Sequence, residues 1–297
     1  MTARSRAPAL TPARMRALPL PRPDEGGDKE ERGRVLVAGG ERENPGALLL
    51  AGTAALRAGA GKLRLAAPAS IAVPLGVALP EARVFALAET KGGAVSPRAA
   101  KELAELAGEV DAFLLGPGMI DPESATPLTR GVLERVEGPA VVLDAGCFTC
   151  LAEGRDALHR LEGRAVITPH AGEMARILGM EEDEVSADPL AVARRAADEL
   201  GAVVALKGAV TFVAAPGGEA YRYERGRVGL ATSGSGDALA GIVAGLLARG
   251  ADPLRAAAWA VWLHGEAGNA LTGRVGRVGF LARELLDEIP AIMDGVG

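Results

Sequence analysis

A glycine-rich stretch that runs straight into an apolar segment is the part of this sequence best suited to chemistry. It covers residues 231–237 (ATSGSGD), and the apolar segment continues to Ala248. Glycines allow consecutive backbone N–H groups to converge, and the first turn of a helix adds partial positive charge, so the stretch favours a bound phosphate. The carboxylate of Asp237 could then accept a proton from a substrate hydroxyl while the loop stabilises a transferred phosphoryl group.

A structural interpretation of Asp237 stays open at this point, because Asp is also a stabilising residue at the start of a helix. The stretch is not a Walker A motif, since no Gly-Lys-Ser/Thr follows it. Residues 59–63 (GAGKL) do not form one either, because they lack the first glycine and the hydroxyl residue.

Three more polar side chains follow short apolar runs. Lys207 could place a positive charge on a phosphate, although a solvated strand end would have the same sequence. His170 follows a proline that fixes the chain, and it could donate to a substrate hydroxyl or amide or be merely structural. Asp144 ends the run 141–143, where α/β sheets present groups to a ligand.

Other titratable residues indicate structure rather than chemistry. His264 lies within an apolar segment and is interpreted as a buried core or interface histidine. Cys147 and Cys150 form a lone C-x-x-C, which could be redox-active or half of a zinc site. Because a zinc site would need two further ligands and the three histidines are widely spaced, we interpret the pair as small buried residues near a strand end.

The composition narrows the class of protein. The chain has 33 Lys+Arg against 38 Asp+Glu, and its positive residues are scattered, which argues against a nucleic-acid partner. No apolar run has the length of a membrane span or the setting of a secretory signal, so we expect a cytoplasmic protein without membrane contact. The 40 glycines predict many tight turns or close approaches of backbone to a ligand.

These residues need a scaffold, and apolar runs that alternate with helical patterns supply it. The first unit comprises a predicted strand at Arg34–Ala38, a helix at about Pro45–Ala58 and a strand at Lys62–Ala66. Further predicted strands are Ala112–Leu115, Ala140–Leu143, Ala165–Ile167 and Val203–Leu206, and further helices are Leu128–Val136, Gly172–Leu178, Pro189–Leu200, Asp237–Ala248 and Pro253–Leu271.

The runs Thr211–Ala215 and Glu219–Tyr223 flank a Pro-Gly-Gly sequence and predict a β-hairpin at the edge of the sheet. Strands interleaved with helices indicate an α/β fold with a mostly parallel sheet covered on both faces. We expect one domain over residues 33–297, preceded by a polar N-terminal segment at 1–32.

The glycine-rich stretch with Asp237, near the end of an alternating α/β chain, resembles the C-terminal signature of ribokinase-like proteins. Further segments resemble motifs of the ADP-dependent NAD(P)H-hydrate dehydratases. They are residues 166–176 (VITPHAGEMAR) for the Thr-Pro-His-x-Gly-Glu segment, 206–211 (LKGAVT) for the Lys-Gly-x-x-Thr nucleotide segment, 44–47 (NPGA) with 57–61 (RAGAG) for the N-terminal substrate segment, and 115–119 (LGPGM) for the central glycine turn. Together, in the family order, these motifs are specific.

The resemblance implies a ribokinase-like three-layer sandwich with a central, mostly parallel sheet flanked by helices. It also implies roles for individual residues. Substrate would contact Ala47, Gly116, Gly118, His170 and Asp237, of which Asp237 is catalytic, and the adenine nucleotide would contact Lys207, Gly208, Ala209, Val210, Thr211 and Gly236. No side chain is assigned as a metal ligand.

In that family, ADP, or ATP in some members, phosphorylates the hydroxyl on a hydrated dihydronicotinamide ring, and elimination of phosphate restores NADH or NADPH. The resemblance therefore implies a carbon–oxygen lyase that uses ADP or ATP. Mg²⁺ is expected, because phosphoryl transfer needs its charge neutralised. A homo-oligomer, with the tetramer as the favoured state, and a separate NAD(P)H-hydrate epimerase as pathway partner are also expected.

Two departures from the family pattern keep alternatives open. Residues 144–148 (DAGCF) stand where the family has Asp-Ala-Asp-Ala-Leu, so the second acid is missing, and residues 28–30 (DKE) stand where it has His-Lys-Gly. The alternatives are a small-molecule kinase of the same fold, acting on a hydroxyethylthiazole or hydroxymethylpyrimidine, and a nucleotide-binding regulatory protein without catalysis. The kinase would leave a stable phosphorylated product, and the regulatory protein would bind without turnover.

Overall fold

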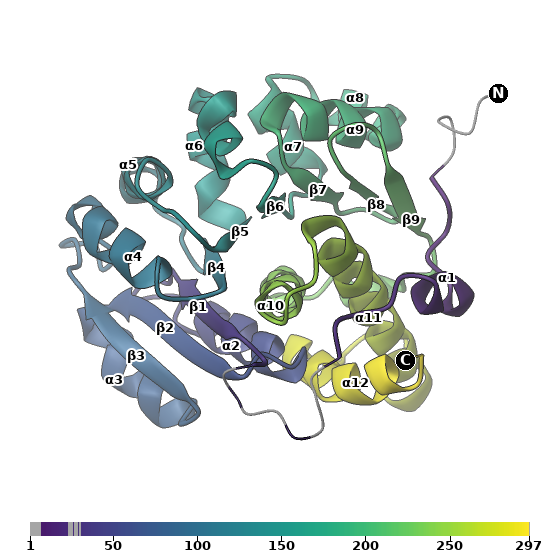
Figure 1. Ribbon diagram of the computed structural model, residues 1–297, viewed down its shortest axis with the longest axis horizontal. Coiled ribbons are helices and arrows are strands. Elements are labelled where there is room, and N and C mark those ends of the chain that lie inside the picture. Colours follow the sequence, from purple (N-terminus) through teal and green to yellow (C-terminus); the bar gives the residue numbers. More distant parts are fainter. Residues whose placement is uncertain (1–6, 23–25, 27–28, 30, 297) are drawn as a thin grey trace.

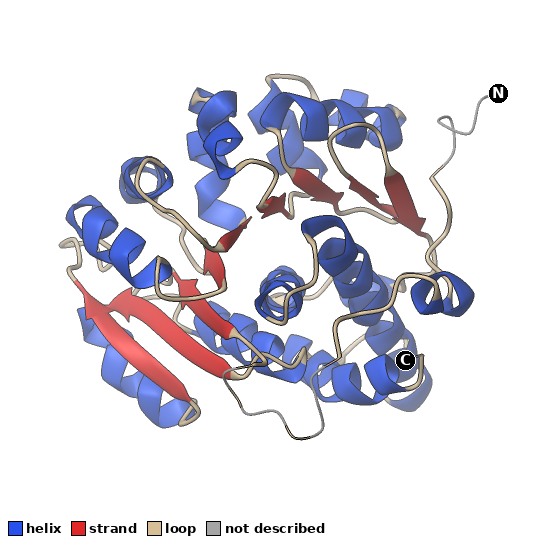
Figure 2. Ribbon diagram, viewed as in Figure 1, coloured by secondary structure: helices blue, strands red, loops and turns tan. Residues whose placement is uncertain are grey.

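One twisted sheet of nine strands forms the centre of the computed structural model, which describes residues 7–22, 26, 29 and 31–296 (Figures 1 and 2). The strand order is β3-β2-β1-β4-β5-β6-β7-β8-β9. Their bounds are β1 Arg34–Ala38, β2 Lys62–Pro68, β3 Ala82–Leu87, β4 Ala112–Leu115, β5 Ala140–Leu143, β6 Ala165–Ile167, β7 Val203–Leu206, β8 Thr211–Ala214 and β9 Ala220–Tyr223. The strands from β3 to β7 pair in parallel, and β8 and β9 pair antiparallel at one edge.

Helices cover both faces of this sheet. The α-helices of the described residues are α1 Pro12–Arg16, α2 Gly46–Arg57, α3 Ala69–Ala78, α4 Ala100–Ala107, α5 Pro122–Leu133, α6 Phe148–Glu153, α7 Ala171–Leu178, α8 Glu182–Ala187, α9 Pro189–Leu200, α10 Ser235–Ala248, α11 Pro253–Arg274 and α12 Ala282–Asp294. One core contains residues of α2, α3 and α10–α12, and the other contains residues of α4–α9. The protein is thus a sandwich of helices, sheet and helices.

Alternation along β1 shows why the strands need two covered faces. Val35 and Val37 belong to the core on the α10 side, whereas Leu36 and Ala38 belong to the core on the α5 side. Successive side chains of a strand point to opposite faces, so an uninterrupted apolar run is stable only when both faces are buried. All four of these residues are fully buried.

Close packing of α10 on α2 depends on two glycines. A Cβ at Gly241 would lie 2.2 Å from the carbonyl oxygen of Ala51, and one at Gly245 would lie 2.4 Å from that of Ala55. Both distances are far below van der Waals contact, so only glycine allows these backbones to approach. Small residues on both helices therefore set the position of α10, and with it the position of the loop that precedes it.

The described part of the N-terminal segment packs onto the domain. Leu10 and Met15 are buried, and the backbone N–H of Leu10 donates to the carbonyl of Arg222 on β9 (2.8 Å). Thr11 caps α1 with its side-chain oxygen. Apolar contacts and sheet-edge hydrogen bonds thus anchor a stretch whose composition alone indicates a polar extension.

The structure confirms the predicted fold class, the parallel strands and the edge hairpin. Boundaries shift, most clearly for α5, which begins at Pro122 because Asp121 supplies an N-cap, and not at Leu128 as the periodicity predicts. The sequence patterns considered above did not predict α1, α3, β3, α4, α6, α8 or α12, although α4 and α12 each carry their buried residues on one helical face. No helix in the described part of the chain is long and apolar enough to cross a membrane.

Candidate active site

The polar residues singled out in the sequence gather at one end of the sheet. Asp144 follows β5, His170 follows β6 and Lys207 follows β7, and the backbones of His170 and Lys207 form an isolated parallel bridge. Asp237 lies in the first turn of α10, which points its N-terminus at the same place. Carboxyl ends of adjacent parallel strands meet at one edge, and this is where open α/β sheets bind ligands.

The glycine-rich loop ends in a helix whose first turn has no side-chain cap. Gly234 is the N-cap residue, with a left-handed backbone (φ +83°), and it leaves the helix start without a side-chain acceptor. Asp237 stands inside the helix, three residues after Gly234, so it is not the N-cap residue, and any stabilising effect of its charge on the helix acts through the helix dipole. The backbone N–H of Ser235 donates to the Thr232 carbonyl (3.2 Å), so the N–H of Gly236 and the helix dipole remain available to an anion.

The carboxyl group of Asp237 is the most strongly perturbed acid of this site. Burial raises its pKa to about 6, the negative charge of Asp144 adds to the increase, and Lys207 opposes it. A carboxyl group with that pKa is ionised at neutral pH, and it is also a much better proton acceptor than an ordinary Asp. Asp237 can therefore serve as a general base.

Asp144 is held in place by neighbours on two strands. Its side chain is almost fully buried, and its Oδ1 accepts a hydrogen bond from the Thr168 hydroxyl (2.8 Å) and lies 3.6 Å from Lys207 Nζ. Lys207 Nζ also lies 3.8 Å from Glu173 Oε2. Two carboxylates thus fix the ammonium group of Lys207 beside Asp237, and its charge can reach a phosphate.

His170 and Glu173 form a capping box at the start of α7. The backbone N–H of His170 donates to Glu173 Oε2 (2.7 Å), and the Glu173 N–H donates to His170 Nδ1 (3.3 Å). The imidazole remains about half exposed, with 54% of its side-chain surface accessible, and it lines the pocket. His170 therefore combines a structural role with a ring that a ligand can contact.

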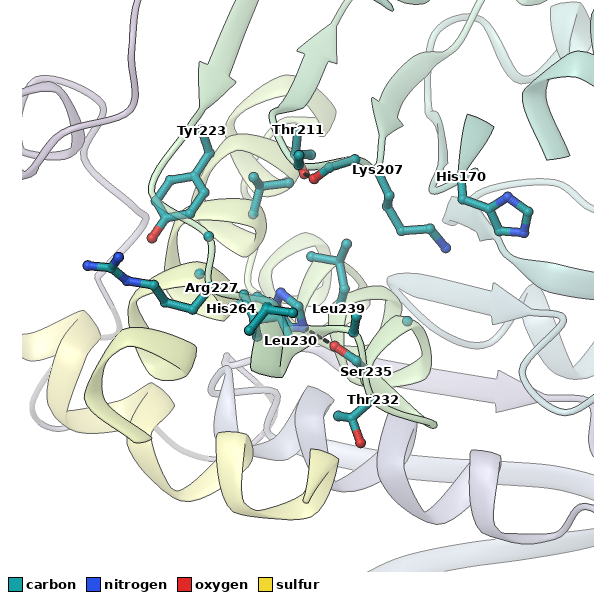
Figure 3. A pocket seen from close by; sticks show the side chains of 18 residues that line it. His170, Lys207, Thr211, Tyr223, Arg227, Leu230, Thr232, Ser235, Leu239 and His264 are labelled. Atoms are coloured by element: carbon teal, nitrogen blue, oxygen red, sulfur yellow. Dashed lines mark hydrogen bonds between the residues drawn. The ribbon is translucent and has the colours of Figure 1, made fainter. Parts of the chain in front are cut away.

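A pocket of about 800 Å³ opens beside Lys207 (Figure 3). Its wall includes the backbone after β7, the glycine-rich loop, and one face of α11. Of the residues expected to hold the adenine nucleotide, it contains Lys207, Gly208, Ala209, Thr211 and Gly236, whereas Val210 is not among the lining residues. Tyr223, Arg227 and Val228 also line the pocket, and no sequence motif indicated them.

His264 of α11 lines this pocket. It is half-buried, not fully buried as the sequence predicts, because it faces the loop, and its Nε2 lies 2.8 Å from the Ser235 hydroxyl (Figure 3). Burial lowers the pKa of His264 to about 4, so the ring is neutral at physiological pH. Sequence reasoning missed this pair, because its two residues lie on different helices.

The glycine turn after β4 lies next to the start of α2. A Cβ at Gly118 would come within 2.9 Å of Ala47 Cβ, and one at Gly116 would come within 1.9 Å of the Asp144 carbonyl oxygen. Both glycines have positive φ. Ala47, Gly116 and Gly118 therefore form a second group that borders Asp144, although none of them lines the pocket beside Lys207.

Packing explains the missing second acid of the 144–148 segment. A Cβ at Gly146 would lie 2.6 Å from the carbonyl oxygen of Met119 and 2.8 Å from its Cβ, so no side chain fits there. The preceding residue, Ala145, has a left-handed backbone (φ +49°). Asp144 is thus the acid that remains at this turn. The other departure, at residues 28–30, involves Asp28 and Glu30, which lie outside the described residues.

Comparison with known proteins assigns this arrangement to a family. A family model described as NAD(P)H-hydrate dehydratase matches residues 35–291. The chain is 46% identical over 290 residues to the ADP-dependent (S)-NAD(P)H-hydrate dehydratase of Xanthomonas campestris, with 97% of each chain covered. It is 41% identical over 274 residues to a bifunctional NAD(P)H-hydrate repair enzyme of Moorella thermoacetica. The aligned region is 92% of this chain but only 52% of that enzyme.

Solved structures agree. The ADP/ATP-dependent NAD(P)H-hydrate dehydratase of Bacillus subtilis, co-crystallised with ATP and Mg²⁺, superposes with a TM-score of 0.81 at 30% identity, covering 98% of this chain and 99% of that one. Ribokinase-like proteins and kinases share the same fold. The predicted ribokinase-like sandwich is therefore confirmed.

Proposed function

Because the chain belongs to the family of NAD(P)H-hydrate dehydratases, we propose that it uses ADP to dehydrate (S)-NAD(P)H hydrate and restore NADH or NADPH. One observation carries this function. Asp237, whose burial raises its pKa to about 6, stands in the uncapped first turn of α10, next to the ammonium group of Lys207.

The reaction needs a base, and Asp237 fits that role. Its carboxylate takes the proton of the ring hydroxyl as the hydroxyl oxygen attacks the terminal phosphorus of ADP, which releases AMP and forms the phosphorylated ring. The N–H of Gly236 in the first turn of α10 and the charge of Lys207 stabilise the negative charge that develops on the phosphoryl oxygens. Phosphate then leaves the ring, a ring proton is lost, and the dihydronicotinamide double bond forms again.

The two groups of residues on either side of Asp144 suit the two substrates. We assign the pocket beside Lys207, with Gly208, Ala209, Thr211 and Gly236, to the adenine nucleotide, and include Val210 through its backbone position in the same turn. Ala47, Gly116, Gly118 and His170 are assigned to the hydrated nicotinamide nucleotide. Asp237 lies between the two groups, where a hydroxyl and a phosphate would meet.

Mg²⁺ is the expected cofactor. The protein's own side chains supply only part of its coordination shell, and the nucleotide would have to supply the rest. In the described chain no cluster of three or more His, Cys, Asp or Glu side chains could hold a metal. Mg²⁺ in phosphoryl-transfer sites typically binds one or two carboxylates and completes its shell with phosphate oxygens and water. Asp144 and Glu173 could supply those carboxylates, and the ion would neutralise charge on the nucleotide.

The relatives support further proposals on its setting. An NAD(P)H-hydrate epimerase is the expected pathway partner, because the chain matches about half the length of relatives that are bifunctional repair enzymes. We also propose a cytoplasmic homotetramer as its working state. Size-exclusion chromatography with light scattering would contradict the tetramer if the purified protein eluted as a monomer.

The direct test follows the near-ultraviolet absorbance that only the intact dihydronicotinamide ring shows. Purified protein is mixed with NADPH hydrate, Mg²⁺ and either ADP or ATP, and recovery that requires a nucleotide supports the dehydratase and identifies its donor. Lys207→Met should slow recovery and weaken nucleotide binding. No recovery, together with a stable phosphorylated product from a small alcohol, would favour the kinase instead.

A further inference from the structure

A second cavity lies at the opposite end of α10 from the catalytic residues. Its volume is about 730 Å³, and Arg249, which follows the last turn of α10, is part of its wall. The helix has 14 residues, so at 1.5 Å per residue its two ends are about 20 Å apart. Residues of the N-terminal segment, Gly59 after α2, Trp259 of α11, and Met293, Asp294 and Val296 near the end of the chain complete the described wall.

Among the described residues that line this cavity, four are arginines, Arg16, Arg22, Arg32 and Arg249, and one is an acid, Asp294. This excess is the reverse of the whole chain, where acids outnumber bases. Arg16, Arg22 and Arg32 are exposed, and none forms an ion pair with any residue that the structure describes. Like charges gathered in one wall repel one another, which costs stability unless an anion lies among them.

Arg249 differs from the other three because its guanidinium is fixed. It donates to the backbone carbonyls of Ala58 (3.0 Å) and Pro21 (2.9 Å), and its side chain lies against Gly59, where a Cβ would come within 2.9 Å of it. Burial lowers the pKa of Arg249, and the neighbouring charge of Arg32 adds to that effect while Asp294 opposes it. A bound anion would relieve this local excess of positive charge.

The rest of the wall is apolar. Met15, Trp259 and Val296 are buried there, and the indole N–H of Trp259 is already used by the carbonyl of Leu18 (2.6 Å). The cavity therefore combines positively charged side chains with an apolar surface, and the indole N–H has no capacity left for a ligand. Arginine guanidinium groups bind phosphate in a planar, bidentate manner, and they also stack on aromatic rings.

We propose that this arginine pocket, defined by Arg16, Arg22, Arg32 and Arg249, is a second ligand site that binds a phosphorylated organic anion with an aromatic or apolar group. A nucleoside diphosphate has the required chemistry. The site is separate from the catalytic pocket, and α10, which begins at one and ends at the other, connects them physically.

Calorimetric titration with ADP tests the site, using the full chain without NAD(P)H hydrate. The wild-type protein should bind two ADP per chain. Arg16→Glu with Arg32→Glu should weaken one of the two sites by about tenfold or more, because charge-assisted contacts to phosphate become repulsive. Lys207→Met should weaken only the other site, so failure of the catalytic assignment and failure of this proposal give different results.

A matched control reverses two positive charges elsewhere. Arg98, just before α4, and Lys101, in its first turn, are exposed and line neither pocket, so their double change to Glu should leave both ADP sites intact. Inorganic pyrophosphate should bind the arginine pocket more weakly than ADP, and adenosine should not bind it. A single ADP site in the wild type that survives the Arg16→Glu/Arg32→Glu change, or adenosine binding as tightly as ADP, would overturn the proposal.

Discussion

The two ends of α10 use glycine for different purposes. In its later turns, Gly241 and Gly245 leave room for the backbone of α2, and any side chain there would collide with Ala51 or Ala55. In its first turn, Gly236 faces open space, because a Cβ there would have only Lys207 Nζ within 4 Å, at 3.5 Å. The same residue type is thus required for packing at one end and leaves space for a ligand at the other.

This difference separates stability from function within one helix. Changes in the packed turns should alter the free energy of unfolding, and changes in the first turn should alter turnover or nucleotide binding. Asp237 lies on the functional side, yet its burial also has a cost in stability. Variants in each region test whether stability and function can be separated experimentally.

The largest expected effect is on turnover. Asp237→Asn should lower kcat by about 10² to 10⁴-fold, because the variant has no base for the ring hydroxyl. Wild-type activity should rise with pH through about 6, where Asp237 loses its proton, and the variant's residual activity should lack this step. The absorbance assay measures both, with Asp183→Asn, an exposed carboxyl of α8, as the unaffected control.

The next effect is on stability in the packed turns. Gly241→Val should destabilise the fold by about 3 kcal/mol or more, because the side chain would push α10 away from α2. Chemical denaturation of the variant and the wild type gives the difference. A change below about 1 kcal/mol would mean that the α2–α10 contact adjusts easily and that packing does not set the position of the loop.

Asp237→Asn also has an effect on stability, of opposite sign. Folding raises the pKa of Asp237 from 3.8 to about 6, so the folded state holds the proton more tightly than the unfolded state does. Ionisation of Asp237 therefore destabilises the fold as the pH rises above about 4, and the full cost is reached above about 6. At pH 8 the neutral Asn should therefore stabilise the fold by about 1 to 3 kcal/mol. The gain should shrink as pH falls through 6 and vanish below about 4. If burial of Asp237 were not the cause, denaturation would show the same stability difference between Asp237→Asn and the wild type at pH 8 and at pH 4.

The smallest effect concerns Gly236. Its replacement by Ala should raise the free energy of unfolding by about 0.5 to 1 kcal/mol, since Ala is the better helix former. The methyl group would nevertheless occupy space next to Lys207, so the KM for nucleotide should rise a few fold while folding is unharmed. Loss of stability without any change in KM would show that this turn belongs with the packed region after all.

Uninterrupted apolar runs such as 112–115 and 140–143 were enough to predict the parallel α/β sheet, because strands buried on both faces leave such runs. Short motifs also indicated Lys207 and His170 at strand ends, and the glycine-rich stretch before a helix indicated Asp237. Elements with weak periodicity, such as α3 and β3, were not predicted, because their partial exposure dilutes the pattern.

Contacts between distant segments were decided only by the tertiary structure. The Ser235–His264 pair, the support of Asp144 by Thr168 and Lys207, and the exclusion of a second acid by Met119 each join residues that local patterns treat separately. The raised pKa of Asp237 has the same origin, since burial and a neighbouring carboxylate are properties of the folded chain. Local sequence encodes periodicity and turns, whereas distances across the sheet exist only once the chain has folded.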